Sequence, residues 1–128
     1  MLKQESDIKE IVFSFRYYDT DCSDWCISEW EKEQIKTALT QLKEINQKKI
    51  TELCRGKPWH SHPVEWKKTI YRDGFPNKSL REMESWQIAL PSVKKTCTRF
   101  FGVIEKNIFH IVWFDLNHKI WPTKLKNT

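Results

Sequence analysis

Apolar and polar side chains alternate near the start of the chain. In residues 11–18, IVFSFRYY, the side chains of Ile11, Phe13, Phe15 and Tyr17 fall on one side of an extended segment. A period of two is typical of a half-buried β-strand. We therefore predict a first strand from Ile11 to Tyr18.

The pattern then changes to a helical period. Apolar side chains recur at intervals of three and four residues, which places them in one stripe that packs against the sheet: Ile35, Ala38, Leu39, Leu42 and Ile45. Ser28 and Glu31 have the S-x-x-E spacing by which side chains satisfy the free N–H groups at a helix start. We predict that this helix begins near Glu29.

A second, shorter helix is predicted from Gln47 to Cys54, and Gly56 is suited to cap its C-terminus. The two helices would form a helical hairpin. Residues 56–76 contain three prolines and two glycines, a composition typical of loops. We interpret them as a loop-rich insertion with a short strand at Lys68 to Arg72.

The C-terminal half is rich in β-forming residues. Three runs, separated by residues compatible with turns, are predicted strands: Ser85 to Leu90, Thr98 to Glu105, and Phe109 to Asp115. The connection between the last two of these strands, Lys106 and Asn107, is short enough for a tight hairpin. A final short strand is predicted from His118 to Trp121. The predicted fold class is α+β: an N-terminal strand and a helical hairpin, followed by an antiparallel three- to four-stranded meander.

Length and net charge bear on the number of domains and on the kind of partner. The 128 residues fit one domain,, with residues 123–128 expected to be a frayed tail. The 22 Lys and Arg residues exceed the 17 Asp and Glu residues and give a net charge of +5, which favours a polyanionic partner.

The distribution of apolar residues along the chain predicts a cytoplasmic protein. No stretch approaches the roughly 18 apolar residues of a membrane span, and the N-terminus lacks the apolar core of a secretion signal. We therefore expect no membrane association. Cys22, Cys26, Cys54 and Cys97 are expected to be reduced thiols,.

Arg99, His118 and Lys119 form the most informative group. In a meander, Arg99 on one strand approaches the end of the next strand, where His118 and Lys119 follow. Two cations and one imidazole can cleave RNA through its own 2′-hydroxyl, because that reaction needs a base and a cation that stabilises the phosphorane. The alternative is that these residues form an ordinary solvated strand face and turn.

Tryptophans add a second candidate feature. Trp86, Trp113 and Trp121 are candidate RNA-binding residues because exposed indole rings stack on bases,. The alternative is that they belong to the core, as most tryptophans of small domains do.

Metal and thiol chemistry were weighed as further alternatives. Cys22, Cys26, Cys54, His60 and His62 include zinc-ligand types, but their spacing lacks the second matched pair of a zinc site. The sequence places no base beside Cys97 that would make it a nucleophile. With only three glycines the chain has no phosphate-binding loop,. We expect neither a metal nor another cofactor.

The closing stretch TRFFGVIEKNIFHIVWFDLNHKIWP, together with the order of predicted elements, resembles the RelE/ParE-type toxin superfamily. This resemblance implies a RelE-like fold and a metal-independent, ribosome-dependent mRNA endonuclease that is paired with an antitoxin protein. It also implies that Arg99 helps to stabilise the scissile phosphate and that His118 and Lys119 occupy positions of basic catalytic residues. Its expected partners are RNA, the ribosome and the antitoxin.

The chain departs from this pattern in two places. Trp121 stands where many members of the superfamily carry a tyrosine, so proton transfer would rest on His118. The insertion at residues 56–76 is also atypical of compact toxins. The sequence therefore leaves a second hypothesis open, a non-enzymatic protein-interaction factor of a mobile element or phage.

Overall fold

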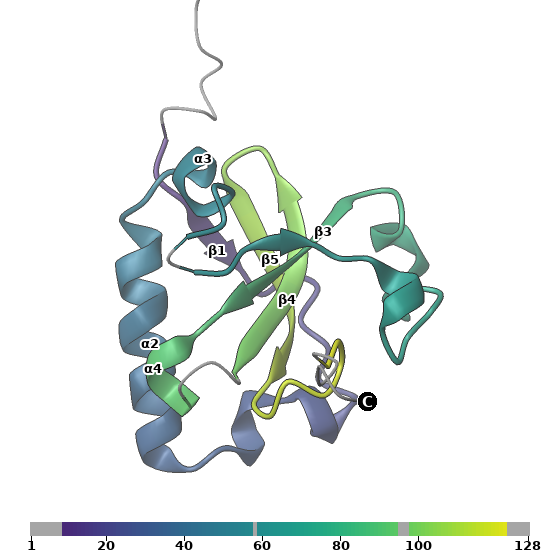
Figure 1. Ribbon diagram of the computed structural model, residues 1–128, viewed down its shortest axis with the longest axis horizontal. Coiled ribbons are helices and arrows are strands. Elements are labelled where there is room, and N and C mark those ends of the chain that lie inside the picture. Colours follow the sequence, from purple (N-terminus) through teal and green to yellow (C-terminus); the bar gives the residue numbers. More distant parts are fainter. Residues whose placement is uncertain (1–8, 58, 95–97, 123–128) are drawn as a thin grey trace, which may run out of the picture.

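The fold is mixed α+β and is built on one five-stranded sheet with the strand order β1-β5-β4-β3-β2 (Figure 1). The computed structural model describes residues 9–57, 59–94 and 98–122. The strands are β1 (Val12–Ser14), β2 (His62–Pro63), β3 (Glu84–Ala89), β4 (Arg99–Glu105) and β5 (Ile108–Asp115). The predictions made for residues 123–128 and for Cys97 lie outside the described residues.

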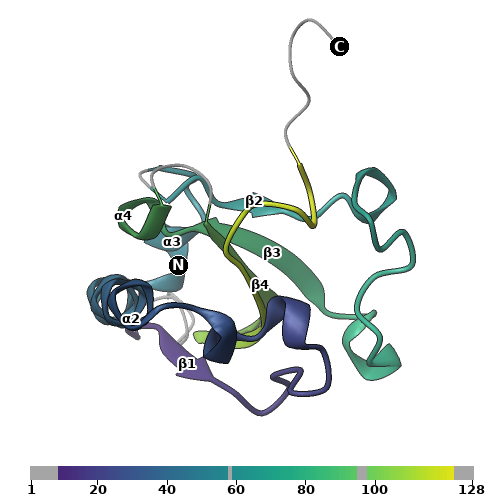
Figure 2. The same cartoon turned by 90° about the horizontal axis from the view of Figure 1, so that it is seen from below.

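The described residues also contain three α-helices and four 3₁₀ helices. The α-helices are α2 (Lys32–Asn46), α3 (Ile50–Leu53) and α4 (Pro91–Lys94). The 3₁₀ helices are η1 (Ser23–Trp25), η2 (Ile27–Glu29), η3 (Trp66–Lys68) and η4 (Lys78–Leu80). In Figures 1 and 2 the α-helices lie to one side of the sheet, and the segment between β2 and β3 lies to the other.

Helix α2 begins later than its sequence predicts. A capping box forms between Glu31 and Gln34, in which the Glu31 backbone N–H donates to Gln34 Oε1 at 3.0 Å. Ser28 lies within η2 instead. Along the predicted stripe, Leu39 is 56% exposed, so the buried face of α2 is narrower than the periodicity indicates.

The register confirms the predicted meander. Strands β2, β3, β4 and β5 are antiparallel neighbours in chain order, and β1 adds to β5 in parallel. Lys106 and Asn107 connect β4 to β5 as the predicted hairpin, and Lys106 has a φ of 56°.

Three strand predictions need correction. β1 ends at Ser14 rather than Tyr18 because the chain turns there, with the Arg16 N–H donating to Ser14 Oγ. The predicted strand from Lys68 to Arg72 is wrong, because the chain bends directly after η3. The Thr69 hydroxyl donates to the Trp66 carbonyl and stabilises this bend. The predicted strand from His118 to Trp121 is also wrong, because this segment follows a turn at residues 116–117 and consists of bends.

Both faces of the sheet are covered by apolar side chains. One core cluster lies between the sheet and α2 and includes Ile45, Phe100 and Phe109. The other covers the opposite face and includes Phe75 and Trp113. Side chains of successive strand residues alternate between these two clusters, as a pleated strand requires, except at Val112 and Trp113, which both belong to the second cluster.

A bulge between Phe101 and Gly102 changes the register of β4 against β5. A Cβ atom at Gly102 would lie 2.0 Å from the His110 carbonyl oxygen. Only glycine permits this close approach of two backbones. The extra residue is Val112 on β5, because Phe101 pairs with Trp113 and Gly102 pairs with Ile111. Arg99, Phe101 and Val103 share one face through the ordinary alternation of β4.

Candidate functional site

A basic pocket opens on the sheet face opposite α2. Its volume is about 780 Å³, within the range of ligand-binding pockets. Three parts of the chain contribute to it: the insertion, the central strands and the turn after β5. The lining residues are His60, His62, Lys67, Lys68, Gln87, Arg99, His118, Trp121 and Pro122.

Strands β3 and β4 supply the floor of the pocket. Gln87 pairs with Phe101, and Arg99 lies two residues before Phe101 on the same strand, so both side chains project from the same face. His62 on β2 pairs with Gln87 from the other side. Arg99 is 8% exposed and Gln87 is 4% exposed, so both belong to a largely desolvated floor.

Hydrogen bonds to backbone carbonyls fix the two segments that surround the pocket, the insertion and the C-terminal turn. The Ile70 N–H in the insertion donates to the Ile120 carbonyl in the C-terminal turn at 2.9 Å. The Thr98 hydroxyl donates to the Leu116 carbonyl at 2.9 Å, which ties the same turn to the start of β4. The insertion and the turn are therefore fixed to each other and to the sheet.

Asp115 organises the turn that carries His118. This carboxylate is fully buried at the end of β5 and accepts the N–H groups of Lys119 at 2.9 Å and Ile120 at 2.8 Å. His118 lies within the loop that these bonds close and has a φ of 56°. Burial raises the pKa of Asp115 above the usual carboxyl range, while both N–H donors and the Arg99 charge oppose that shift.

His118 is held in its neutral form. Partial burial is the main cause that lowers the pKa of His118 below 6.5, and the nearby Arg99 charge lowers it further. A hydrogen bond with the Trp121 backbone acts in the opposite direction. At pH 7 the imidazole is therefore able to accept a proton.

The pocket is electrostatically positive. Its described lining contains Arg99, Lys67 and Lys68 but no carboxylate. Glu65 lies just outside, where it forms an ion pair of 3.0 Å with Lys68. Both side chains of that pair are well exposed, so solvent weakens the neutralisation of Lys68. A site of this charge and shape favours an anion, and Trp121 adds an aromatic wall.

Three of the six residues selected from sequence lie in this pocket: Arg99, His118 and Trp121. Lys119 is exposed and lines a neighbouring recess with Asp24 and Trp25.

Trp86 and Trp113 belong to the core. Trp86 packs on the α2 side of the sheet, and Trp113 is 1% exposed on the opposite side. The Trp113 indole N–H donates to Asp19 Oδ2 at 2.8 Å. Neither ring has a free face on which a base could stack.

Sequence reasoning missed part of the pocket. His60, His62 and Lys67 come from the insertion, where the histidines were considered only as metal ligands. The available signal was the density of basic and imidazole side chains over residues 60–68. Gln87 carried no signal, because a glutamine within an apolar strand is not distinctive without its neighbours.

Within residues 9–57, 59–94 and 98–122, no group of three or more His, Cys, Asp or Glu side chains is arranged to hold a metal ion. The thiols of Cys22, Cys26 and Cys54 are free. Within the same ranges, no helix combines the length and apolar character needed to cross a membrane.

Three kinds of comparison were made with known proteins. The chain matches no protein-family model, no curated protein and no solved structure.

Proposed function

We propose that the basic pocket binds RNA and that the protein is a metal-independent, RelE-like endoribonuclease. The observation that supports this proposal is the meeting of Arg99, His118 and Lys67 in one pocket whose described lining has no carboxylate. Phosphodiesters attract such a site, and its desolvated floor strengthens the interaction.

The reaction would use the RNA's own 2′-hydroxyl. Neutral His118 removes the hydroxyl proton, and the oxygen attacks the adjacent phosphorus. Arg99, assisted by Lys67, stabilises the negative charge that develops on the phosphorane. His60 and His62 line the same pocket and offer imidazoles that can protonate the leaving 5′-oxygen. The products are a 2′,3′-cyclic phosphate and a 5′-hydroxyl.

The order of elements supports the toxin part of the proposal. A strand, two helices and an antiparallel meander follow one another along the chain. We extend the proposal to a ribosome-dependent toxin controlled by an antitoxin protein. The pocket is broad and basic enough for an mRNA segment, and the ribosome would supply the remaining alignment.

Induced expression tests the proposal in cells. Growth is followed for the wild type and for His118→Asn while mRNA 5′ ends are mapped. Asparagine tolerates the positive φ at this position and removes the titrating imidazole. Lys119→Ala is the matched control, because Lys119 lies in the same turn but lines the neighbouring recess.

We expect growth arrest and new 5′-hydroxyl ends with the wild type and with Lys119→Ala, and neither with His118→Asn. The purified protein would then be assayed on mRNA with and without ribosomes. Intact mRNA in cells that contain soluble wild-type protein would refute the enzymatic proposal and favour the non-enzymatic interaction factor.

A further inference from the structure

One buried amide in the pocket lacks a hydrogen-bond partner. Gln87 is 4% exposed, and its Oε1 atom has no partner among the described residues. A buried polar atom of this kind destabilises the folded protein unless a ligand or water satisfies it. Gln87 also lines the basic pocket, so a rotation of its side chain would present the amide to a ligand in that pocket.

A second buried glutamine provides a comparison. Gln41 on α2 is 5% exposed, but its Oε1 accepts the N–H of Ser92 at 3.0 Å. The fold therefore satisfies a buried amide where that amide has a structural task. Gln87 Oε1 has no such partner among the described residues, which leaves its hydrogen-bonding capacity for a bound molecule.

The pocket that Gln87 lines has a volume of about 780 Å³, which is enough for a flat group. Its neighbours on the same face of β3 are Ser85 and Ala89, which pair with Val103 and Arg99 on β4. Both neighbours are small. Trp121 lines the same pocket from the C-terminal turn, so a planar ligand can stack on an indole while its edge meets the amide.

We propose that Gln87 reads the base of the bound RNA and selects adenine. This inference rests on the proposed function. A glutamine amide presents one acceptor and one donor side by side, and adenine presents the complementary pair through its N6 amino group and an adjacent ring nitrogen. The N6 amino group donates to the unsatisfied Oε1, and the Gln87 Nε2 group donates to the ring nitrogen.

Binding to short RNA analogues tests the inference. The probes are heptamers in which every sugar carries 2′-fluorine, so that they lack the attacking hydroxyl. Uracil occupies the six outer positions, and the centre carries adenine, guanine, cytosine or unsubstituted purine. Unsubstituted purine differs from adenine only in lacking the amino group. We expect the wild type to bind the adenine probe about tenfold more tightly than each of the others, the discrimination typical of one paired base edge.

Two variants test whether the adenine preference comes from the Gln87 amide. Gln87→Leu removes both polar groups of the amide, and it should bind the four probes with nearly equal affinity. Gln41→Leu, the matched control on the other side of the sheet, should keep the adenine preference.

The possible outcomes distinguish base reading by Gln87 from RNA binding by the pocket. Wild-type protein that binds all probes equally, or a Gln87→Leu variant that keeps the preference, would overturn base reading and leave RNA binding intact. Wild-type protein that binds none of the probes would overturn both proposals. The comparison of adenine with unsubstituted purine needs only the wild type, so it does not depend on whether a variant folds.

Discussion

Arg99 and Asp115 are direct cross-strand partners at the end of the β4–β5 pair. Their side chains share the pocket face of the sheet, where Arg99 belongs to the pocket floor and Asp115 ties the turn beyond it. One buried carboxyl group therefore faces Arg99 across the two strands and positions the predicted base, His118. Asp115 is a positioning residue in this arrangement, because it lines the neighbouring recess rather than the pocket.

Replacing Asp115 with asparagine should weaken the turn. An amide has one oxygen, so one of the N–H groups of Lys119 and Ile120 would face an NH₂ group instead of an acceptor. We expect the free energy of unfolding to fall by about 1–3 kcal/mol, the cost of an unsatisfied buried donor. Urea denaturation measures this loss, and exposed Asp73 provides the control, since Asp73→Asn should change it by less than about 0.5 kcal/mol.

The same variant has a kinetic signature. Displacement of His118 should lower kcat more than it raises KM, because RNA still meets Arg99 and Lys67. A variant that lost stability but retained wild-type kcat at a temperature where it is folded would show that Asp115 has only a structural role.

The pH dependence of cleavage should reflect neutral His118. Its pKa lies below 6.5 because of burial and the Arg99 charge, and a general base is active in its unprotonated form. The limb on which the rate rises with pH should therefore be centred below pH 6.5. Measurement of kcat/KM from pH 4.5 to 8 tests this expectation, and a limb centred above pH 6.5 would contradict it.

His118 should also affect stability as the pH falls. The unfolded chain binds a proton at this residue near pH 6.5, whereas the folded protein binds it only at lower pH. This contribution to the free energy of unfolding is present above pH 6.5 and is lost as the pH falls to the lowered pKa. Urea denaturation at pH 7.5 and pH 5.5 should show a smaller acid-side loss for His118→Asn than for the wild type.

The pocket lysines should govern the salt dependence of RNA binding. Each phosphate contact with single-stranded RNA contributes about 0.7 to the slope of log affinity against log salt. Lys67→Ala combined with Lys68→Ala should reduce that slope by about 1. Fluorescence anisotropy of labelled RNA at several salt concentrations measures it.

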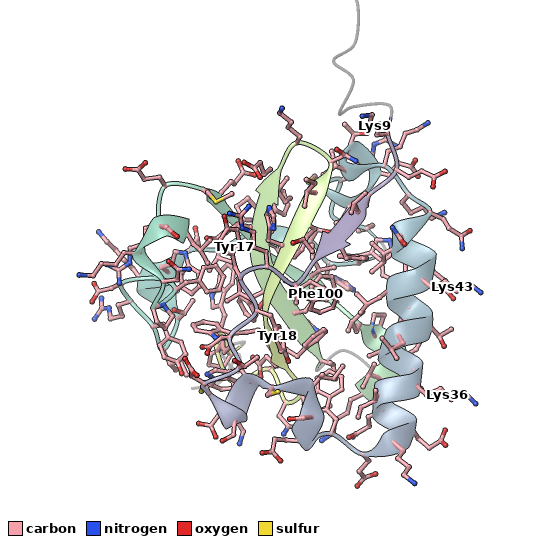
Figure 3. The ribbon with its side chains drawn as sticks, turned by 180° about the vertical axis from the view of Figure 1, so that it is seen from behind. Lys9, Tyr17, Tyr18, Lys36, Lys43 and Phe100 are labelled. Atoms are coloured by element: carbon pink, nitrogen blue, oxygen red, sulfur yellow. The ribbon has the colours of Figure 1, made fainter. Side chains whose placement is uncertain are left out.

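A charge-matched control comes from the other side of the sheet. Lys36 and Lys43 project from α2 away from the sheet (Figure 3), and their combined replacement by alanine removes the same net charge. This second pair should leave the slope nearly unchanged. Equal effects of the two double variants would indicate attraction by net charge rather than binding in the pocket.

Gln87 and Gln41 should respond oppositely to the same substitution. Gln87→Leu removes a buried oxygen that has no partner among residues 9–57, 59–94 and 98–122, and it should raise the free energy of unfolding by about 1–3 kcal/mol. Gln41→Leu removes the acceptor of the Ser92 N–H and should lower it by a similar amount. Thermal denaturation without RNA compares the two variants, and destabilisation by Gln87→Leu would indicate that its amide has a structural partner.

Local sequence pattern was sufficient for most of the fold. The alternation in the C-terminal half located β3, β4 and β5 to within one residue at each end, and the Lys106-Asn107 hairpin followed from its length. These features depend on side-chain period and turn chemistry, which act over a few residues. Side-chain period and turn chemistry wrongly predicted a strand at residues 118–121. The Asp115 carboxylate accepts the N–H groups of Lys119 and Ile120, so these groups do not pair with another strand.

Sequence by itself also determined which chemical groups are present, and it selected Arg99 and His118 together because adjacent antiparallel strands bring their ends close. Only the tertiary structure decided which groups share a pocket. Trp121 lines the pocket while Trp86 and Trp113 are core, and β2 brings His62 beside Gln87. These assignments depend on packing between segments distant in the chain, and periodicity within one segment carries no information about such contacts.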